Sequence, residues 1–313
     1  MGVQKVAVIG GGTGLAVLLR GLKKYDVDIS AIVTVADDGG SSGRLRKELN
    51  IPPPGDVRNV LAALAEVEPL IEQLFQHRFK DGEGLTGHTL GNLLLAGMTS
   101  ITGDFARGIT ELSKVLNVGG KVLPVSNDSL ELAAEMKDGS IVYGESSIPH
   151  AEQTIDRVFI EPRNPAALPE TIQAIREADK IVIGPGSLFT SVLPNLLVPE
   201  ITEEIKQSTA KKLYICNVMT QYGETEQFSA SDHVKAIQRH VGNDVFDHVL
   251  VNEAPIPKEM TNRYMEEGAE AVVCDTKNLQ ALGLRVIQDN FIRIESSHLR
   301  HHAEKLSEII IEL

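Results

Sequence analysis

The chain has 313 residues, of which 42% are hydrophobic and 23% charged, the balance of an ordinary globular protein. Its 43 acidic residues outnumber its 30 basic ones, and the formal net charge is −13. Because nucleic acids are bound through many Lys and Arg contacts, this balance argues against DNA or RNA as the main partner. Cys216 and Cys274 lie in apolar, strand-like runs, which predicts buried reduced thiols. With no signal-peptide pattern and no apolar stretch of about 20 residues, we expect a cytoplasmic protein with no membrane span.

The N-terminal segment predicts the start of a parallel sheet. Residues 6–9 form a continuous apolar run, typical of a strand buried on both faces. A glycine-rich loop follows at residues 10–14, and leucines then recur at helical spacing over residues 15–22. Residues 29–35 have the pattern of a second strand. This order predicts an α/β protein with a Rossmann-like, doubly wound, mostly parallel sheet.

The middle of the chain is predicted to be helical. Leu, Ala and Ile recur at helical spacing over residues 55–79 and 89–118, which predicts a helical insertion around residues 55–118. We expect this insertion to form a layer beside the ligand-binding edge of the sheet. Residues 122–125 predict a strand, and residues 130–136 and 141–143, joined by an Asp-Gly turn, predict an antiparallel β-hairpin.

From residue 158 the alternation of strands and helices is expected to resume. Strands are predicted at residues 158–160, 180–183, 212–216, 248–251 and 271–274, and an amphipathic helix over residues 298–313. The apolar run at residues 188–201 is either core or a subunit contact, and the second alternative would make the protein a homo-oligomer. Since no long linker divides the chain, we predict one continuous domain over residues 1–313.

The glycine-rich loop at residues 10–14 predicts a phosphate-binding site. Glycine lets the backbone approach a ligand, and the following helix offers free N–H groups and a positive dipole end to an anion. A dinucleotide fingerprint would need a third glycine where Leu15 stands, and no Gly-Lys-Ser/Thr of a Walker loop follows. The alternative is a tight turn without a ligand. We predict that a phosphate-bearing nucleotide contacts Gly11, Gly12, Thr13 and Gly14.

A second loop, residues 37–44, follows the second strand and should face the same crevice. Its carboxylates suit ribose hydroxyls or a divalent cation such as Mg²⁺. Alternatively, its serines cap a helix and its arginine is a solvated surface charge. We predict ligand contacts here from Asp37, Asp38, Ser41, Ser42 and Arg44, with Asp37 and Asp38 as the ligands of any divalent cation.

Two further motifs place polar groups at helix starts, Gly-Asp-Val-Arg-Asn at residues 55–59 and Gly-His-Thr-Leu-Gly-Asn at residues 87–92. Asp56 and Thr89 are explained equally well as N-caps. Capping does not explain the other polar groups as readily. We predict that Asn59, His88 and Asn92 belong to the ligand site.

The motif Gly-Pro-Gly-Ser at residues 184–187 repeats the strand–glycine–helix pattern and predicts a second anion site, with Gly186 and Ser187 in contact with the ligand. A simple helix cap is the alternative. Asn217 and Thr220 follow another strand and are predicted to rim the same crevice. His298 and His302 have the spacing of a zinc pair on a helix, but with no third ligand evident a solvated helix face is favoured.

These motifs together resemble the gluconeogenesis factor family, the bacterial branch of the CofD-like superfamily. The motifs that carry the resemblance are VIGGGTG, ADDGGSSGRLR, PPPGDVRN, GHTLGNLLL, IGPGSLFTS and NVMTQYGET, and they span essentially the whole chain. The resemblance implies a Rossmann-like fold, a cytoplasmic location and a role in cell shape and cell-wall precursor supply during gluconeogenic growth. It also implies binding of UDP-N-acetylglucosamine, with Tyr264 and Arg300 in the ligand site. The superfamily's 2-phospho-L-lactate transferases use a guanosine nucleotide, a deazaflavin and Mg²⁺ held by acids such as those matching Asp37 or Asp38.

Three functions are therefore open. The leading hypothesis is a non-enzymatic nucleotide-sugar sensor that regulates a partner enzyme of amino-sugar or cell-wall synthesis. The second is a Mg²⁺-dependent, phospholactate-transferase-like enzyme that uses a nucleotide-diphosphate donor. The third, an NAD(P)-binding protein, is disfavoured by the missing third glycine.

Overall fold

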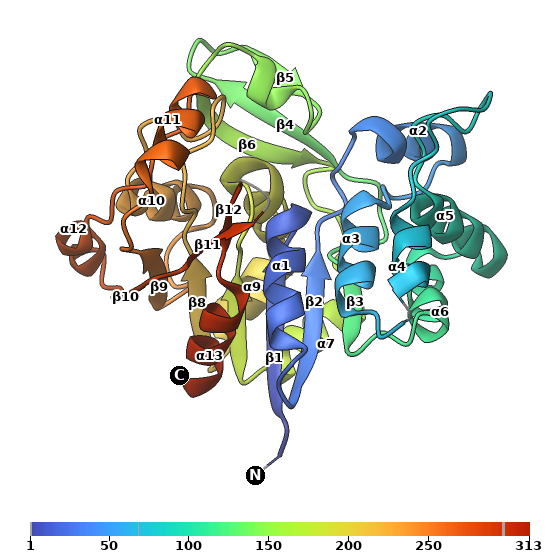
Figure 1. Ribbon diagram of the computed structural model, residues 1–313, viewed down its shortest axis with the longest axis horizontal. Coiled ribbons are helices and arrows are strands. Elements are labelled where there is room, and N and C mark those ends of the chain that lie inside the picture. The colour runs from blue at the N-terminus through green and yellow to red at the C-terminus, as the bar shows by residue number, and fades with distance from the viewer. Residues whose placement is uncertain (1, 68, 296–297) are drawn as a thin grey trace.

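The computed structural model describes residues 2–67, 69–295 and 298–313 (Figure 1). Its centre is a seven-stranded sheet in the order β10-β9-β8-β7-β1-β2-β3, in which all neighbouring strands are parallel. The strands are β1 (Gln4–Gly10), β2 (Val27–Val33), β3 (Lys121–Pro124), β7 (Lys180–Ile183), β8 (Lys211–Ile215), β9 (His248–Asn252) and β10 (Arg285–Asp289). The predicted Rossmann-like, doubly wound parallel sheet is confirmed.

Helices cover both faces of this sheet. On the face turned toward the viewer in Figure 1, α1 (Gly12–Leu22) packs between α3 (Gly55–Leu64) and α13 (Ala303–Glu312). Behind the sheet, α7 (Pro169–Glu177) packs against α9 (Pro199–Gln207). Apart from the helices beside the β3 edge, the other helical segments are α2 (Gly40–Leu49), α8 (Leu193–Leu196), α10 (Ala230–Val241), α11 (Lys258–Glu266), α12 (Thr276–Ala281), the short 3-10 helix η1 (Ile148–His150) and the π-helical turn η2 (Leu188–Val192).

The predicted helical insertion is present beside the β3 edge of the sheet. It consists of α3, α4 (Pro69–Gln76), α5 (Leu90–Thr102) and α6 (Phe105–Val115), in which α5 packs along α6. Within the described residues 55–67 and 69–118, no strand longer than a single bridge interrupts the helices. The layer forms the right-hand side of the molecule in Figure 1.

The predicted β-hairpin is also present, formed by β4 (Glu131–Met136) and β5 (Ile141–Tyr143), with Gly139 at a φ of 84° in the turn. It belongs to a separate three-stranded antiparallel sheet in the order β5-β4-β6. The strand predicted at residues 158–160 is the core of β6 (Ile155–Glu161), but it pairs antiparallel with β4 and does not continue the parallel sheet. A short strand pattern does not reveal which sheet the strand joins.

The structure corrects the C-terminal predictions. Residues 271–274 make only one isolated bridge, from Ala271 to Met219, and the edge strand of the sheet is β10. Residues 298–301 form β12 (His298–His301), which pairs antiparallel with β11 (Ile292–Glu295). The final helix therefore begins only at Ala303, and His298 and His302 do not share a helix. The alternation of an exposed His298, a buried Leu299 and an exposed Arg300 is the period-two pattern of a strand.

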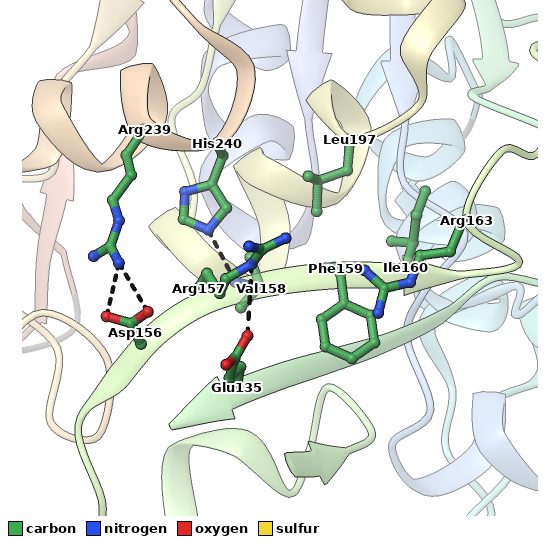
Figure 2. A pocket seen from close by; sticks show the side chains of 10 residues that line it. All are labelled: Glu135, Asp156, Arg157, Val158, Phe159, Ile160, Arg163, Leu197, Arg239 and His240. Atoms are coloured by element: carbon green, nitrogen blue, oxygen red, sulfur yellow. Dashed lines mark hydrogen bonds and ion pairs between the residues drawn. The ribbon is translucent and has the colours of Figure 1, made fainter. Parts of the chain in front are cut away.

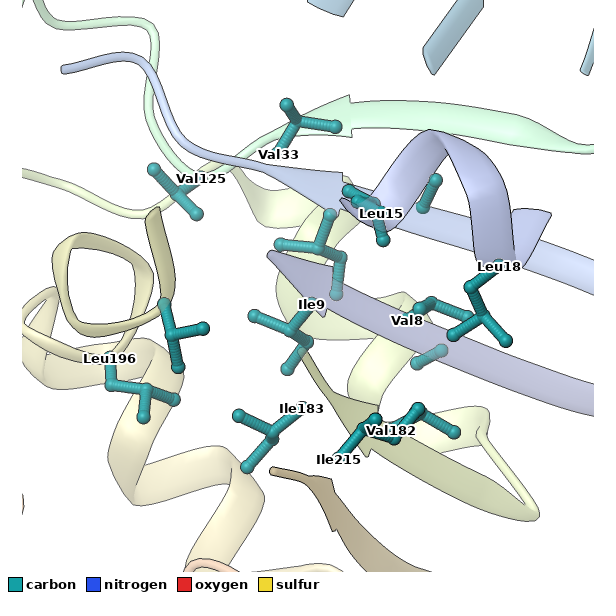
Figure 3. Packing of buried hydrophobic residues seen from close by; sticks show 14 of the residues in the cluster. Val8, Ile9, Leu15, Leu18, Val33, Val125, Val182, Ile183, Leu196 and Ile215 are labelled. Atoms are coloured by element: carbon teal, nitrogen blue, oxygen red, sulfur yellow. The ribbon is translucent and has the colours of Figure 1, made fainter. Parts of the chain in front are cut away.

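The core lies around the central strands (Figure 3). Val8 and Ile9 of β1, Val182 and Ile183 of β7, and Ile215 of β8 are almost completely buried there. The apolar run at residues 188–201 is largely core, because Leu188, Phe189, Val192, Leu193, Leu196, Val198 and Ile201 are all buried.

Cys216 is buried and free as predicted, whereas the free Cys274 is half-buried and lies outside any strand. Among the described residues, we find no helix with the length and hydropathy needed to cross a membrane.

Candidate functional site

The chain reverses its direction of travel across the sheet between β1 and β7. From β1 it runs outward through β2 to β3, and it later returns to β7 and continues through β8 to β10. Doubly wound proteins bind ligands in the crevice outside the carboxyl ends of the strands at such a reversal. The two predicted glycine loops meet here, since a Cβ added to Gly14 would lie 3.2 Å from the backbone of Pro185. Glycine at this position lets the two loops pack directly on each other.

A cavity of about 220 Å³ opens beside this meeting point. Its walls come from the first turns of α1, from the segment after β8, from α11 and from β12. The lining residues are Thr13, Gly14, Val17, Asn217, Val218, Met219, Thr220, Gln221, Tyr264, Leu299, Arg300 and His301. The cavity thus gathers Thr13, Gly14, Asn217, Thr220, Tyr264 and Arg300, which are distant in the sequence and were all predicted as ligand residues.

Hydrogen bonds fix the walls of this cavity. The backbone N–H of Leu299 donates to the Tyr264 hydroxyl over 3.1 Å, which ties the tyrosine to β12 beside the exposed Arg300. The Asn217 amide nitrogen donates to the carbonyl oxygen of Gly186 over 3.0 Å, linking the segment after β8 to the second glycine loop. Thr220 is tied to Glu270 through both its backbone N–H and its hydroxyl. The cavity is therefore a preformed space held by contacts between four parts of the chain.

A half-buried carboxylate, Asp56, contacts the first glycine loop. Asp56 accepts a hydrogen bond from the backbone N–H of Gly12, the first residue of α1. Burial, together with the nearby charge of Asp37, raises the pKa of Asp56 to about 7. Asp56 was interpreted as a possible N-cap of its own helix, α3, but it caps α1. One of the amides expected to meet a ligand phosphate is thus already paired within the protein.

The second glycine loop has the same arrangement. Glu224 accepts hydrogen bonds from the backbone N–H of Phe189 over 3.2 Å and from the Thr190 hydroxyl over 3.0 Å, at the start of η2. Its side chain is buried, and this burial raises its pKa to about 7. Ser187 does not cap η2 with its side chain; its hydroxyl donates to Gln221 over 2.7 Å. A carboxylate of the chain therefore occupies the start of η2, and the contact of Gly186 and Ser187 with an anion stays a prediction.

Acidic side chains gather beyond the first loop. Asp37 accepts a hydrogen bond from the N–H of Gly39, and Asp38 accepts one from the N–H of Ser146. Burial and the charges of Asp37, Asp56, Asp38 and Glu224 raise the pKa of Glu145 to about 8. Within the described ranges, no three His, Cys, Asp or Glu side chains converge as ligands of one metal ion. Mg²⁺ is commonly held by one or two carboxylates together with substrate phosphates, so binding of Mg²⁺ by Asp37 and Asp38 stays a prediction.

Comparisons with known proteins agree with this fold and with the motifs. The family described as 2-phospho-L-lactate transferase CofD matches residues 6–292. The chain belongs to the gluconeogenesis factor family of the CofD-like superfamily. It is 65% identical over 309 residues to the gluconeogenesis factor of Halalkalibacterium halodurans, covering 99% of this chain and 96% of the relative. It is 60% identical over 309 residues to the gluconeogenesis factor of Bacillus subtilis, covering 99% and 98%.

A solved structure extends the agreement to the whole fold. The crystal structure of a UPF0052-family protein from Bacillus halodurans matches this chain with a TM-score of 0.97 at 65% identity, covering 98% of this chain and 99% of that one. The parallel sheet, the helical layer and the antiparallel sheet thus belong to a fold shared between the two proteins.

In this member of the family, several predicted ligand residues lie outside the cavity and contact one another. The Ser41 hydroxyl and the His88 Nδ1 are 2.9 Å apart, and Asn92 donates to Ser41 over 3.0 Å. All three are buried, and burial together with Arg44 lowers the pKa of His88. This cluster ties α2 to α5. Its role toward a ligand stays a prediction.

The other predicted residues outside the cavity are close to the same loops. Arg44 donates to the carbonyl oxygen of Thr86 over 2.6 Å, which holds α2 against residues 82–88. The Ser42 hydroxyl lies close to Gly55, and a Cβ added to Gly55 would clash with it. Asn59 is half-buried on α3. Gly11 faces Asp56 and Thr34, whose side chains a Cβ at Gly11 would overlap.

Sequence reasoning missed three residues of the site: Gln221 and His301 on the cavity wall, and Glu224, which accepts a hydrogen bond from Gln221. Gln221 and Glu224 belong to the NVMTQYGET motif that marks the family. The motif indicated that these residues matter, but the sequence alone did not show that they lie beside the cavity. His301 was placed within a predicted helix, and the period-two pattern of residues 298–301 was the signal that it lies on a strand.

A second cavity, of about 320 Å³, lies between β6 and the end of α10 (Figure 2). It carries three arginines, and each faces a carboxylate. Arg239 donates to Asp156 over 2.8 Å, and Arg157 lies 3.7 Å from Glu135. Arg163 stacks on the Phe159 ring and pairs with Glu161. Because these cations are matched by acids, this cavity attracts a phosphate less than the one beside Arg300.

Proposed function

We propose that the cavity between Thr13, Tyr264 and Arg300 binds UDP-N-acetylglucosamine. The observation that carries this proposal is the gathering of an aromatic ring, a guanidinium group and the first turn of a helix around one preformed space. A ring stacks on a nucleobase, and a guanidinium pairs with diphosphate through charge-assisted hydrogen bonds. The resemblance to UDP-sugar-binding members of the family points to the same two side chains.

The ligand would lie with its uracil against Tyr264 and its diphosphate between Arg300 and the start of α1. The amides of Thr13 and Gly14 belong to the helix turn whose N–H groups have no partner within the helix. At about 220 Å³ the cavity is smaller than the ~300–1,000 Å³ typical of pockets that enclose a whole ligand. The sugar would therefore extend over the rim, where a partner protein can sense it.

We further propose that occupancy of this cavity regulates a partner enzyme of amino-sugar or cell-wall synthesis, and so supports cell shape and cell-wall precursor supply during gluconeogenic growth. The lining residues support binding: a cation, an aromatic ring, amides and hydroxyls. Arg300 is exposed on a two-stranded β-sheet at the molecular surface, where a bound sugar and a partner can meet. The partner would contact the bound ligand and the protein surface around it at the same time.

A thermal-shift assay tests the proposal. A ligand that binds only the folded protein stabilises it by about 2.7 kcal/mol at 100 times its Kd. Millimolar UDP-N-acetylglucosamine should therefore raise the melting temperature by several degrees, and GDP and NAD should raise it less. An unchanged melting temperature with the UDP-sugar would reject the proposal.

A transferase is the competing proposal, because the matching family is described as 2-phospho-L-lactate transferase CofD. The same panel, run with and without Mg²⁺, separates the two functions. A transferase would show its largest stabilisation with a guanosine nucleotide and Mg²⁺. It would also release nucleotide from an activated phospholactate donor, and Asp38→Asn would abolish that turnover without changing the melting temperature.

A further inference from the structure

One histidine on the cavity wall has a fixed hydrogen-bonding role. His301 is the last residue of β12 and pairs in register with Ile292 of β11, which holds its backbone in place. Its Nε2 lies 3.3 Å from the backbone carbonyl oxygen of Cys216. A carbonyl oxygen only accepts hydrogen bonds, so Nε2 must carry the proton. In the neutral ring, Nδ1 is then left as a lone-pair acceptor.

The ring stays neutral at physiological pH. Burial lowers the pKa of His301 to about 4, and the hydrogen bond to the Cys216 carbonyl only partly opposes that effect. A second proton therefore does not bind to Nδ1 near pH 7. His301 lines the cavity, and its ring carries an acceptor that does not change into a donor.

Asn217 lies on the same cavity wall and is held in place by the second glycine loop. The Asn217 side-chain nitrogen is committed to the carbonyl oxygen of Gly186, and its Oδ1 is buried without a hydrogen-bond partner in the described structure. Because this oxygen is buried, it is not itself open to a ligand in the cavity. The cavity wall thus combines the acceptor of His301 with the cationic Arg300.

We propose that His301 is a specificity-determining residue that accepts a hydrogen bond from the N3–H of a uracil ring. This inference rests on the proposed function of the cavity, and it names the feature of the base that is recognised. Uracil carries a hydrogen at N3, whereas cytosine has a lone pair there. With cytosine, two acceptors would face each other and neither would be paired, so the cavity should select uridine over cytidine nucleotides.

Calorimetric titration with UDP and CDP tests this inference on the full chain. The wild-type protein should bind UDP at least about tenfold more tightly than CDP, the size expected for one hydrogen bond and one unpaired acceptor. His301→Leu should weaken UDP binding about tenfold and leave CDP binding unchanged, which brings the two affinities close together. His301→Gln keeps both an N–H donor for Cys216 and an acceptor oxygen, and should restore part of the preference.

The control is His150→Leu, which removes an exposed histidine outside the cavity and should leave both affinities unchanged. Equal wild-type affinities for UDP and CDP, or a His301→Leu protein that keeps the wild-type ratio, would overturn the inference. If His301→Leu does not fold, the wild-type ratio and His301→Gln decide the question. UDP binding that depends on Arg300 but shows no preference over CDP would contradict this inference and leave the proposed function standing. No binding of either nucleotide would contradict the proposed function as well.

Discussion

The two regions that border the first turn of α1 differ in charge. Thr13 and Gly14 face the cavity that carries Arg300, whereas Gly11 and Gly12 face Asp56. Asp56 pairs with the amide of Gly12 and lies near the acidic Asp37. One glycine loop therefore has two roles: its start packs against a carboxylate of the protein, and its end opens toward the site proposed for a ligand.

The second glycine loop also packs against a carboxylate of the protein. Its helix start is capped by Glu224, and its contribution to the cavity is structural, through Gly186 to Asn217 and Ser187 to Gln221. A glycine-rich turn at the carboxyl edge of a sheet is a frequent anion site, but an internal carboxylate can fill it. This comparison supports the phosphate contact that we propose beside Arg300, away from the acidic side chains.

The largest expected effect comes from removing the cation of the cavity. Arg300→Ala should weaken UDP-N-acetylglucosamine binding about 10- to 100-fold, because a hydrogen bond to a charged group contributes about 1.5–3 kcal/mol. The exposed position predicts an unchanged melting temperature. Calorimetric titration measures the loss, and Arg176→Ala, an exposed arginine on α7, is the matched control. An equal loss of affinity in both variants would show that Arg300 does not bind the ligand specifically.

The next effect concerns the aromatic wall. Tyr264→Ala should weaken nucleotide binding about tenfold, since stacking of a base on a ring contributes about 1–3 kcal/mol. Tyr264→Phe keeps the ring but removes the acceptor of the Leu299 N–H, so its loss should be smaller. Titration of both variants with UDP shows which variant loses more affinity. A Phe variant as weak as the Ala variant would show that the hydroxyl, and not the ring, supports binding.

The acidic region predicts a dependence of stability on pH. The folded-state pKa of Asp56, about 7, lies above its usual value of 3.8, so the folded protein holds a proton that the unfolded chain releases between these values. The contribution of Asp56 to stability is present below pH 4 and is lost as pH rises toward 7. Asp56→Asn keeps an acceptor for Gly12 and should raise the melting temperature more at pH 8 than at pH 5.

Melting curves at the two pH values check this prediction, with Asp81→Asn as an exposed control. An Asp56→Asn protein whose change in melting temperature is equal at pH 5 and pH 8 would contradict the assigned charge state. A larger gain at pH 5 would reverse the sign of the argument.

The smallest effect on binding is expected from the cluster between α2 and α5. Ser41→Ala removes the group that links His88 and Asn92, and should lower the free energy of unfolding by about 1–3 kcal/mol. UDP-N-acetylglucosamine affinity should change less than threefold, because this cluster lies outside the cavity. Denaturant unfolding and titration measure the two quantities. A tenfold loss of affinity would extend the ligand site to α2.

Much of the fold follows from local patterns. The buried strand at residues 6–9, the period of the helical layer and the Asp-Gly turn each depend on neighbouring residues, and each was predicted. The partner of a strand depends on residues far away, so β6 was assigned to the wrong sheet and β10 was missed. In the site, the sequence marked the glycine loops, but only the folded chain shows that Asp56 accepts from the Gly12 N–H and Glu224 from the Phe189 N–H.

The central claim is the location of the ligand, and a crystal structure of the protein with UDP-N-acetylglucosamine tests it most directly. We predict uracil against Tyr264 with its N3–H toward His301, and diphosphate between Arg300 and the start of α1. A nucleotide bound instead against residues 37–44, or bound without contact to Tyr264 and Arg300, would contradict this account.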